Sequence, residues 1–415
     1  MRLMKLGLPW IWPAALACFV IAGSTGSLYR FGLINGLPGG WGLVNVRHAH
    51  SHLMYFGWAT PALMALIVTW LPRLTGQAVT RRFQWVMSAT IVVALLAYLM
   101  FFQYGYQVAE IGGRRIPLSV LMATLNVLTW YAFSFLYFRS TWGVQRVRPL
   151  RFWDASLIFL LLASMGAWGV AVVSRLQVED PFWSQAMTHL FLDLFSEGWF
   201  VLAALGLVYA MHPIDAIKAS QEKAAHWSEQ LIVIGLPVLF LLALPVGQVP
   251  DGLRVIAAFG GLLVAAGVLA SVAALWPAVP RGLSGWRIPL ALLTLKVLVG
   301  LGTLLPVTAR WGQQNNLRIL YLHLLLLGFI SLGLFVAARE AWGHQSVPGQ
   351  RWLVMVIFAL LLSLLPLTGL WPIAWRSAWA LRVAAWVSIW PVLVVVGILV
   401  TLLFREWRAK SALPE

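Results

Sequence analysis

Twelve long apolar runs constrain the fold of this 415-residue chain more than any other feature. Each run has the roughly 20 residues that a helix needs to cross a hydrocarbon core about 30 Å thick. The runs cover approximately residues 10–32, 50–71, 84–103, 117–138, 153–174, 184–210, 228–247, 253–276, 287–306, 316–338, 351–372 and 380–404. Only 10% of all residues are charged, whereas soluble domains carry about 25%. The sequence therefore predicts an all-α membrane protein, a bundle of twelve transmembrane helices in a single domain over residues 1–415.

The basic residues predict the membrane topology. A net charge of +16 would suggest nucleic-acid binding in a soluble protein, but here Lys and Arg flank the apolar runs, where they set orientation. Most of the 29 Lys and Arg residues fall on the cytoplasmic side if both the N-terminus and the C-terminus are cytoplasmic. We therefore expect membrane lipid as a partner, no nucleic acid, and a multi-pass location in the bacterial cytoplasmic (inner) membrane. Tryptophans at run ends, such as Trp12 and Trp41, are expected at the lipid–water interface.

Histidines cluster at the start of the second run, where residues 47–56 read RHAHSHLMYF. In the predicted topology the second, sixth and tenth runs begin at the outer surface. His50, His189 and His323 then lie at a common depth, in the outer quarter of the membrane. A haem iron with two axial imidazoles needs one histidine on each of two facing helices. His50 and His323 meet this requirement, so the sequence predicts a low-spin, bis-His haem b. The alternatives are copper, zinc or non-haem iron, which also suit imidazole-rich sites.

The neighbours of these two histidines extend the predicted site. Arg47 and Arg318 lie on the outer side of His50 and His323, and arginine suits bidentate pairing with the carboxylates of haem propionates. His52, two residues after His50, is a further candidate metal ligand; it can equally be a solvated or supporting group.

A polar stripe is predicted in the sixth run. His189, Asp193 and Glu197 are spaced four residues apart, which places them on one helix face over about 12 Å. One imidazole with one or two carboxylates suggests a site for a hard metal ion, or a proton relay. These three residues are the candidate catalytic residues. The alternative is a buried polar stripe that holds helices together.

Three motifs resemble subunit I of the haem-copper oxidase superfamily. RHAHSHLMYFG resembles its helix 2, with Arg47 and His50 at the places of the arginine and the low-spin haem ligand. HLFLDLFSE (189–197) resembles helix 6 of the nitric oxide reductase large subunit, where a His-x-x-x-Glu-x-x-x-Glu run supplies one ligand of a non-haem iron and two carboxylates. YLHLLLLGFISLGLF (321–335) is similar to helix 10, where His323 matches the low-spin ligand. Tyr321 stands in the place of the proximal histidine of the active-site haem.

The departures from this family are equally informative. The family carries adjacent histidines in helix 7, whereas the seventh run here, WSEQLIVIGLPVLFLLALPVG, has none. The resemblance thus implies a degenerate member that keeps the low-spin haem and lacks most ligands of the catalytic binuclear centre. A second haem, with Tyr321 as a candidate ligand, or a copper or non-haem iron ion would be further cofactors. It implies electron transfer, or an oxidoreductase acting on NO or O2, with a cytochrome c-type or quinol electron donor and a partner subunit.

Two other functions stay open. HSHLMYFG (50–57) and TWLPRLTG (69–76) resemble the signature of NnrS-type membrane proteins, which carry haem and copper and act in the response to nitric oxide stress. A cofactor-free ion or proton-coupled transporter is the third class. Lys296 in the ninth run, with Glu197 and Asp193 in the sixth, could line an ion path, and Pro306 marks a candidate helix break.

Overall fold

The computed structural model describes residues 9–212, 219–282, 285–372 and 377–411. The structure is 82% helical. Among the described residues, eleven helices are long and apolar enough to cross a membrane, and a bent pair, Arg287–Gly302 with Pro306–Gln314, makes a twelfth span if counted as one. The chain is therefore an all-α, multi-pass membrane protein, as predicted.

The chain divides into two compact units. Unit 1 comprises Met1–Trp142, Leu334–Leu367 and Trp371–Glu415, and unit 2 comprises Gly143–Gly333 and Thr368–Leu370. We describe each unit by itself, and the single domain over residues 1–415 stays a prediction.

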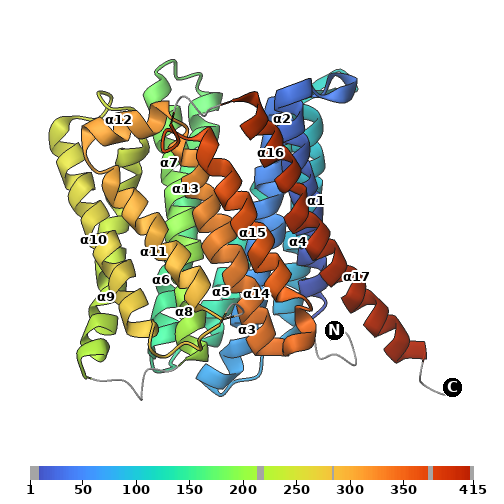
Figure 1. Cartoon of the computed structure of the whole chain (residues 1–415), viewed down its shortest axis with the longest axis vertical. Coiled ribbons are helices and arrows are strands. Elements are labelled where there is room, and N and C mark those ends of the chain that lie inside the picture. Colours follow the sequence, from blue (N-terminus) through green and yellow to red (C-terminus); the bar gives the residue numbers. More distant parts are fainter. Residues whose placement is uncertain (1–8, 213–218, 283–284, 373–376, 412–415) are drawn as a thin grey trace. The chain divides into compact units, whose positions relative to one another are not determined.

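Unit 1 is built from long helices, three short 3-10 turns and one small hairpin (Figure 1). Within it α4 packs between α2 and α5, and α1 packs along α2 and α17. A two-stranded antiparallel hairpin, with Ala109 paired to Ile116, joins α4 to α5. The elements are α1 (Ile11–Asn35), η1 (Pro38–Gly40), α2 (Leu43–His52), η2 (Leu53–Ala59), α3 (Thr60–Thr75), α4 (Arg81–Tyr104), β1 (Ala109–Ile111), β2 (Arg114–Ile116), α5 (Leu118–Ser140), α14 (Leu332–Trp342), η7 (His344–Ser346), α15 (Gln350–Leu364), η8 (Leu365–Leu367), α16 (Ala378–Val387) and α17 (Ile389–Ser411).

Aromatic rings form part of the core of unit 1. The ring of Trp12 lies 5.6 Å from that of Trp58 and 5.5 Å from that of Phe335. Its indole N–H donates to the carbonyl oxygen of Ser346 at 3.1 Å. Trp12 is fully buried, so the expectation that it belongs to the interfacial belt is wrong; Trp41 is 44% exposed, as a belt residue should be. A tryptophan at a span end can enter the core because its single polar atom needs only one acceptor.

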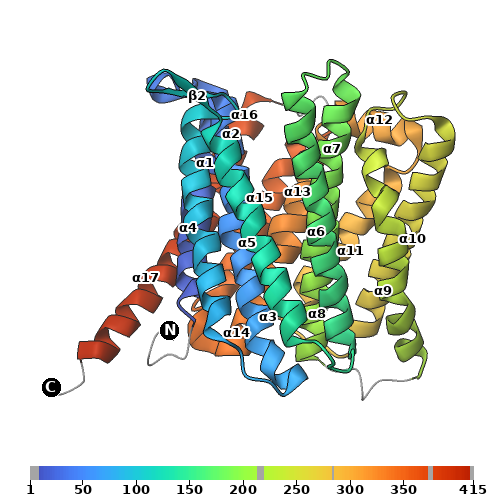
Figure 2. The same cartoon turned by 180° about the vertical axis from the view of Figure 1, so that it is seen from behind.

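Unit 2 holds the remaining helices (Figure 2). Helices α9 and α10 pack closely because glycines let their backbones approach. A Cβ on Gly260 would lie 2.8 Å from the carbonyl oxygen of Gly235, and a Cβ on Gly235 would contact the carbonyl oxygen of Gly260. Small residues serve this purpose in membrane helices. The elements are α6 (Arg148–Arg175), α7 (Pro181–Asp193), η3 (Leu194–Val201), α8 (Leu202–Met211), α9 (Ala219–Leu239), η5 (Phe240–Ala243), α10 (Asp251–Leu275), α11 (Arg287–Gly302), α12 (Pro306–Gln314), α13 (Leu317–His323) and η6 (Leu324–Ser331).

Three π-helical segments, η2, η3 and η6, interrupt the second, sixth and tenth spans. These are the most buried spans: 78%, 83% and 72% of their most apolar 18-residue segments are buried, against at most 50% in the others. Each π segment begins with a leucine, and a glycine and an aromatic residue follow four and five positions later. The three stretches are Leu53 to Trp58, Leu194 to Trp199 and Leu324 to Phe329. The same spans carry the predicted site histidines. Because π segments are frequent at functional sites, they direct attention to these spans.

Candidate functional site

The polar stripe of the sixth span forms one wall of a cavity inside unit 2. Helix α7 begins where the Asp180 side chain accepts a hydrogen bond from the backbone N–H of Phe182 at 2.9 Å, with Pro181 at the first helical position. His189, Asp193 and Glu197 follow at intervals of four residues, and all three line the cavity. The structure thus brings the three predicted catalytic residues to one surface.

The cavity has a volume of about 580 Å3. Its other walls come from α9, η5, α10, α11, α12 and α13, and most of their side chains there are apolar. A ligand site of this size falls in the usual range of roughly 300–1,000 Å3 for small molecules.

A buried ion pair lies at the cavity wall. The Lys296 ammonium of α11 pairs with the Glu197 carboxylate of η3, and each residue is only 4% exposed. The Tyr321 hydroxyl of α13 donates to Oε1 of the same carboxylate at 3.2 Å. The Lys296 ammonium also lies 4.7 Å from the centre of the Tyr321 ring, where the negative face of the ring favours a cation. Three helical segments of unit 2 are therefore joined by one carboxylate.

The ion pair supplies the counter-charge that Glu197 needs. An isolated ion in apolar surroundings costs several kcal/mol. The ammonium of Lys296, a residue of the same chain, compensates the charge of the Glu197 carboxylate. Among the described residues no three His, Cys, Asp or Glu side chains form a group that could hold a metal ion. The metal predicted at His189, Asp193 and Glu197 stays a prediction.

The ninth span is broken beside this cavity. Helix α11 ends at Gly302, and α12 begins at Pro306 with a bend of 114° between the two axes. Thr303 and Leu304, in the break, line the cavity. Pro306 was a predicted site for a broken helix, and the break falls directly before it, as expected from the missing N–H and the fixed backbone angle of proline.

His50 lies on α2 in unit 1. Its Nδ1 is 2.7 Å from the carbonyl oxygen of Ala22 on α1. A carbonyl oxygen only accepts, so Nδ1 carries the proton and donates, which leaves Nε2 unprotonated in the neutral ring. Gly26, one turn further along α1, makes room for the ring: a Cβ there would lie 2.6 Å from Cε1 of His50. Arg47, one turn earlier on α2, is exposed.

His323 lies at the end of α13 in unit 2. Its Nδ1 is 2.7 Å from the carbonyl oxygen of Ile319 in its own helix, so this ring too donates from Nδ1. Arg318 is exposed at the start of α13 and lines the cavity. The predicted pairing of His323 with His50 joins residues of the two units and stays a prediction.

His52 is packed among aromatic rings in unit 1. Its ring stacks on Phe101 with 3.8 Å between centroids and meets Phe56 edge-on. The Nδ1 atom of His52 is buried and has no hydrogen-bond partner among the described residues. These contacts favour a packing role; its role as a metal ligand stays a prediction.

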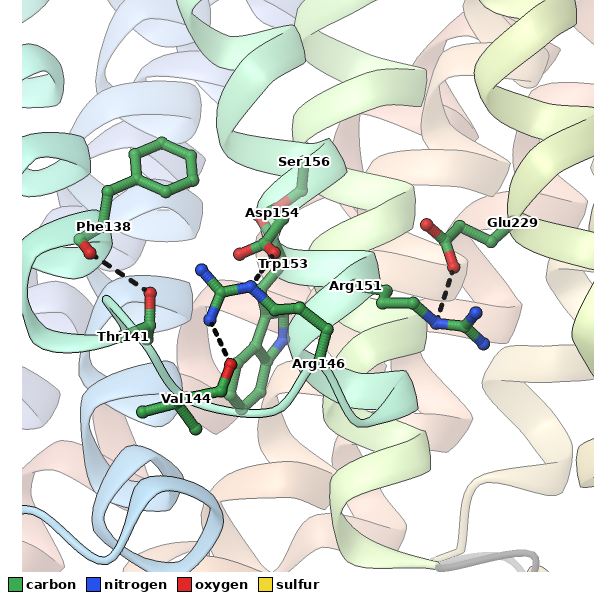
Figure 3. A network of polar contacts seen from close by, with 9 residues as sticks. All are labelled: Phe138, Thr141, Val144, Arg146, Arg151, Trp153, Asp154, Ser156 and Glu229. Atoms are coloured by element: carbon green, nitrogen blue, oxygen red, sulfur yellow. Dashed lines mark hydrogen bonds and ion pairs between the residues drawn. The ribbon is translucent and has the colours of Figure 1, made fainter.

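Basic residues just before and in the first turn of α6 form ion pairs, at the end of the helix away from α7. Arg146 pairs with Asp154 at 2.8 Å, and Arg151 pairs with Glu229 at 3.4 Å (Figure 3). Membrane lipid is the partner expected of basic residues that flank the apolar runs. The side chains remain 35% and 30% exposed, so the protein partners leave part of each guanidinium accessible to headgroups.

Comparison with known proteins gives no match: no family model fits the chain, and no curated protein is similar enough to match it.

Proposed function

We propose that this protein is an integral membrane b-type haem protein that transfers electrons, with His50 and His323 as the axial ligands of a low-spin haem. The observation that carries this proposal is the hydrogen bond between Nδ1 of each ring and a backbone carbonyl oxygen. Each donates its Nδ1–H to a backbone carbonyl at 2.7 Å, which fixes the tautomer that presents Nε2 to a metal. Metal-ligating histidines almost always make such a bond.

Other residues support the same assignment. Gly26 leaves space beside the His50 ring that any side chain would fill. Arg47 and Arg318, each within two turns of its histidine, are exposed cations suited to propionates. Tyr321 donates to Glu197, and we therefore assign it to the polar wall rather than to a second haem. When bound, the haem supplies a one-electron redox couple. With both axial positions occupied, it has no open position for O2 or NO.

The wider proposal follows the resemblance to the haem-copper oxidase superfamily, as a degenerate relative of the nitric oxide reductase large subunit. We propose the bacterial inner membrane as its location, with both termini cytoplasmic. In unit 1 the first turn of α1 and the last turn of α17 lie toward the same end (Figures 1 and 2), which supports a common side for the termini. An NnrS-type role in nitric oxide stress uses the same histidines and is the alternative within haem proteins.

A redox difference spectrum of the purified full-length protein, expressed with added haem precursor, tests the proposal. We expect the sharp reduced bands of a bis-imidazole haem, lost in both His50→Ala and His323→Ala. His226→Ala is the matched control, because His226 is an exposed histidine of α9. A colourless wild-type protein, or a full spectrum in both histidine variants, would refute the assignment.

A cofactor-free transporter is the second candidate. The 114° break of the ninth span beside a cavity with a buried ion pair is the observation that favours it, because broken helices form the central sites of many transporters. The test is ion-driven uptake of a solute into vesicles that contain the purified protein. Uptake by a colourless protein, abolished in Glu197→Gln, would establish this function in place of the first.

A further inference from the structure

The Arg254 side chain is buried in the first turn of α10 without a partner. It is 5% exposed, and its Nε, Nη1 and Nη2 atoms are all buried and make no hydrogen bond with the part of the chain that the structure describes. Arginine is almost never fully buried unless it is paired, because burying an uncompensated ion is costly. Arg254 therefore needs an anion that the described residues do not supply.

The charged groups around Arg254 leave one positive charge over. Asp251 attracts the guanidinium, and Arg310 of α12 repels it. Asp251 lies three residues earlier in the same turn, is exposed, and forms no ion pair with Arg254 among the described residues. Arg310 is exposed as well. Two cations and one carboxylate make a site that suits a ligand with a single negative charge.

The break of the ninth span packs against the same face of α10 as Arg254. A Cβ on Gly261 would lie 2.7 Å from Cδ2 of Leu304, a residue of the break. Gly261 follows Arg254 by seven residues, which is two turns on one helix face and about 10 Å along the axis. Helix α12, which carries Arg310, begins two residues after Leu304 and lies at the end of unit 2 where α7 begins (Figure 1). The two arginines therefore lie at one end of unit 2.

This end of α10 lies at the level of the lipid headgroups. The helix is a span of 25 residues, so its first turn falls near the boundary between hydrocarbon and water. Leu253 and Val255, on either side of Arg254 in the sequence, are 46% and 68% exposed, and Val307 of α12 is 72% exposed. Exposed apolar side chains of a membrane span face acyl chains. The anion that a bilayer offers between acyl chains and water is the phosphate of a phospholipid.

We propose that the start of α10 and the short helix α12 form a binding site for one anionic phospholipid of the phosphatidylglycerol type. The Arg254 side chain is long enough to turn toward the headgroup, and its guanidinium donates two parallel hydrogen bonds to phosphate oxygens. Arg310 adds its charge from α12, and the acyl chains lie along Leu253 and Val255. One headgroup then joins α10 to α12 and stabilises the bent ninth span.

This site differs from the general contact between basic residues and lipid. The arginines shown in Figure 3, Arg146 and Arg151, each have a carboxylate partner in the chain. Arg254 has none among the described residues, so the lipid phosphate completes its pairing. The site is also independent of the proposed haem, because none of the haem residues takes part in it.

Binding of radiolabelled phosphatidylglycerol to the purified, delipidated full-length protein in detergent micelles tests the proposal. We expect saturable binding, weakened at least about tenfold in Arg254→Gln, because charge-assisted hydrogen bonds are lost. Arg254→Lys keeps the charge without the planar fork and should bind more weakly than the wild type. Arg310→Gln, at an exposed residue, should also weaken binding. Arg175→Gln is the matched control, because it removes an exposed arginine from the last turn of α6, and it should bind as the wild type does.

Thermal unfolding separates a binding site from a structural role of Arg254. Without phospholipid, Arg254→Gln should unfold at the wild-type temperature or above it, because the substitution removes an unpaired buried cation. Added phosphatidylglycerol should raise the midpoint of the wild type, as a ligand of the native state does, and should leave that of Arg254→Gln unchanged. A variant that is less stable without lipid, and that lipid stabilises as much as the wild type, would show a structural role and overturn the proposal.

Two competitors identify the source of the phosphate. Phosphatidylcholine has the phosphate and the acyl chains but no net charge, and inorganic phosphate has no acyl chain. Neither should displace the labelled lipid at an equal concentration. Displacement by phosphatidylcholine with the same affinity would mean general lipid contact, and displacement by inorganic phosphate with the same affinity would mean a site for a soluble anion. Either result, or binding no greater than that of empty micelles, overturns the proposal.

Discussion

Replacing Lys296 by Met tests the energetic role of the buried ion pair. The substitution leaves the Glu197 carboxylate, 4% exposed, without its cation. Breaking one side of a buried pair costs about 3–5 kcal/mol. Glu197→Gln should cost less, roughly 1–3 kcal/mol. The Lys296 ammonium loses its carboxylate but is still stabilised by the face of the Tyr321 ring, whose centre lies 4.7 Å away. The amide oxygen of the new Gln also keeps the hydrogen bond from the Tyr321 hydroxyl.

The double variant Lys296→Met with Glu197→Gln makes this a thermodynamic cycle. Replacing both members of a buried pair is often close to neutral, so the double variant should be more stable than Lys296→Met alone. The thermal unfolding midpoint in detergent, followed by tryptophan fluorescence, is the assay. A unit of roughly 190 residues changes its midpoint by about 2–4 °C per kcal/mol, so Lys296→Met should lower it by roughly 6–20 °C. A loss in the double variant equal to the sum of the two single losses would refute the reasoning, because additive losses mean that the two charges do not interact.

Three further predictions concern packing and the surface. Gly26→Ala should displace the His50 ring, lower stability by about 1–3 kcal/mol and remove the low-spin haem spectrum. Gly397→Ala is the control, because a Cβ there meets nothing within 4 Å, and it should leave both the unfolding midpoint and the spectrum unchanged. Gly235→Ala should force α9 away from the carbonyl of Gly260 and lower the unfolding midpoint, at a cost of about 1–3 kcal/mol; an unchanged midpoint would contradict the close packing of these helices. Asp154→Asn should change stability by no more than about 1 kcal/mol in urea or heat, since its partner Arg146 is 35% exposed.

The helical membrane architecture could be predicted from the sequence because it depends on local composition. A run of about 20 apolar residues has few other stable environments than a bilayer. The bend before Pro306 has the same local origin. Its angle of 114° was not predictable, because the angle depends on how α12 packs against the rest of unit 2.

The candidate site was predicted only in part, for a reason that lies in the chain's long-range contacts. The spacing of His189, Asp193 and Glu197 is a property of one helix and indicates their common wall. The partner of Glu197 lies 99 positions away, at Lys296, and no local pattern joins the two. One signal was available: Lys296 is an ionisable residue inside an apolar span, and such a residue needs a partner. The three π segments could also have been sought through the leucine–glycine–aromatic spacing that they share.

The ion pair also explains how one wall can hold both a structural and a functional group. In apolar surroundings a carboxylate is stable only with a counter-charge or a proton, and Lys296 gives Glu197 the first. Because the Glu197 carboxylate already binds Lys296 of α11 and Tyr321 of α13, it links η3 to both helices and has few hydrogen-bond positions left for a ligand. Asp193 and His189, which lie one and two turns before Glu197, form no ion pair among the described residues. The ion pair therefore contributes to stability, while Asp193 and His189 line the cavity beside it.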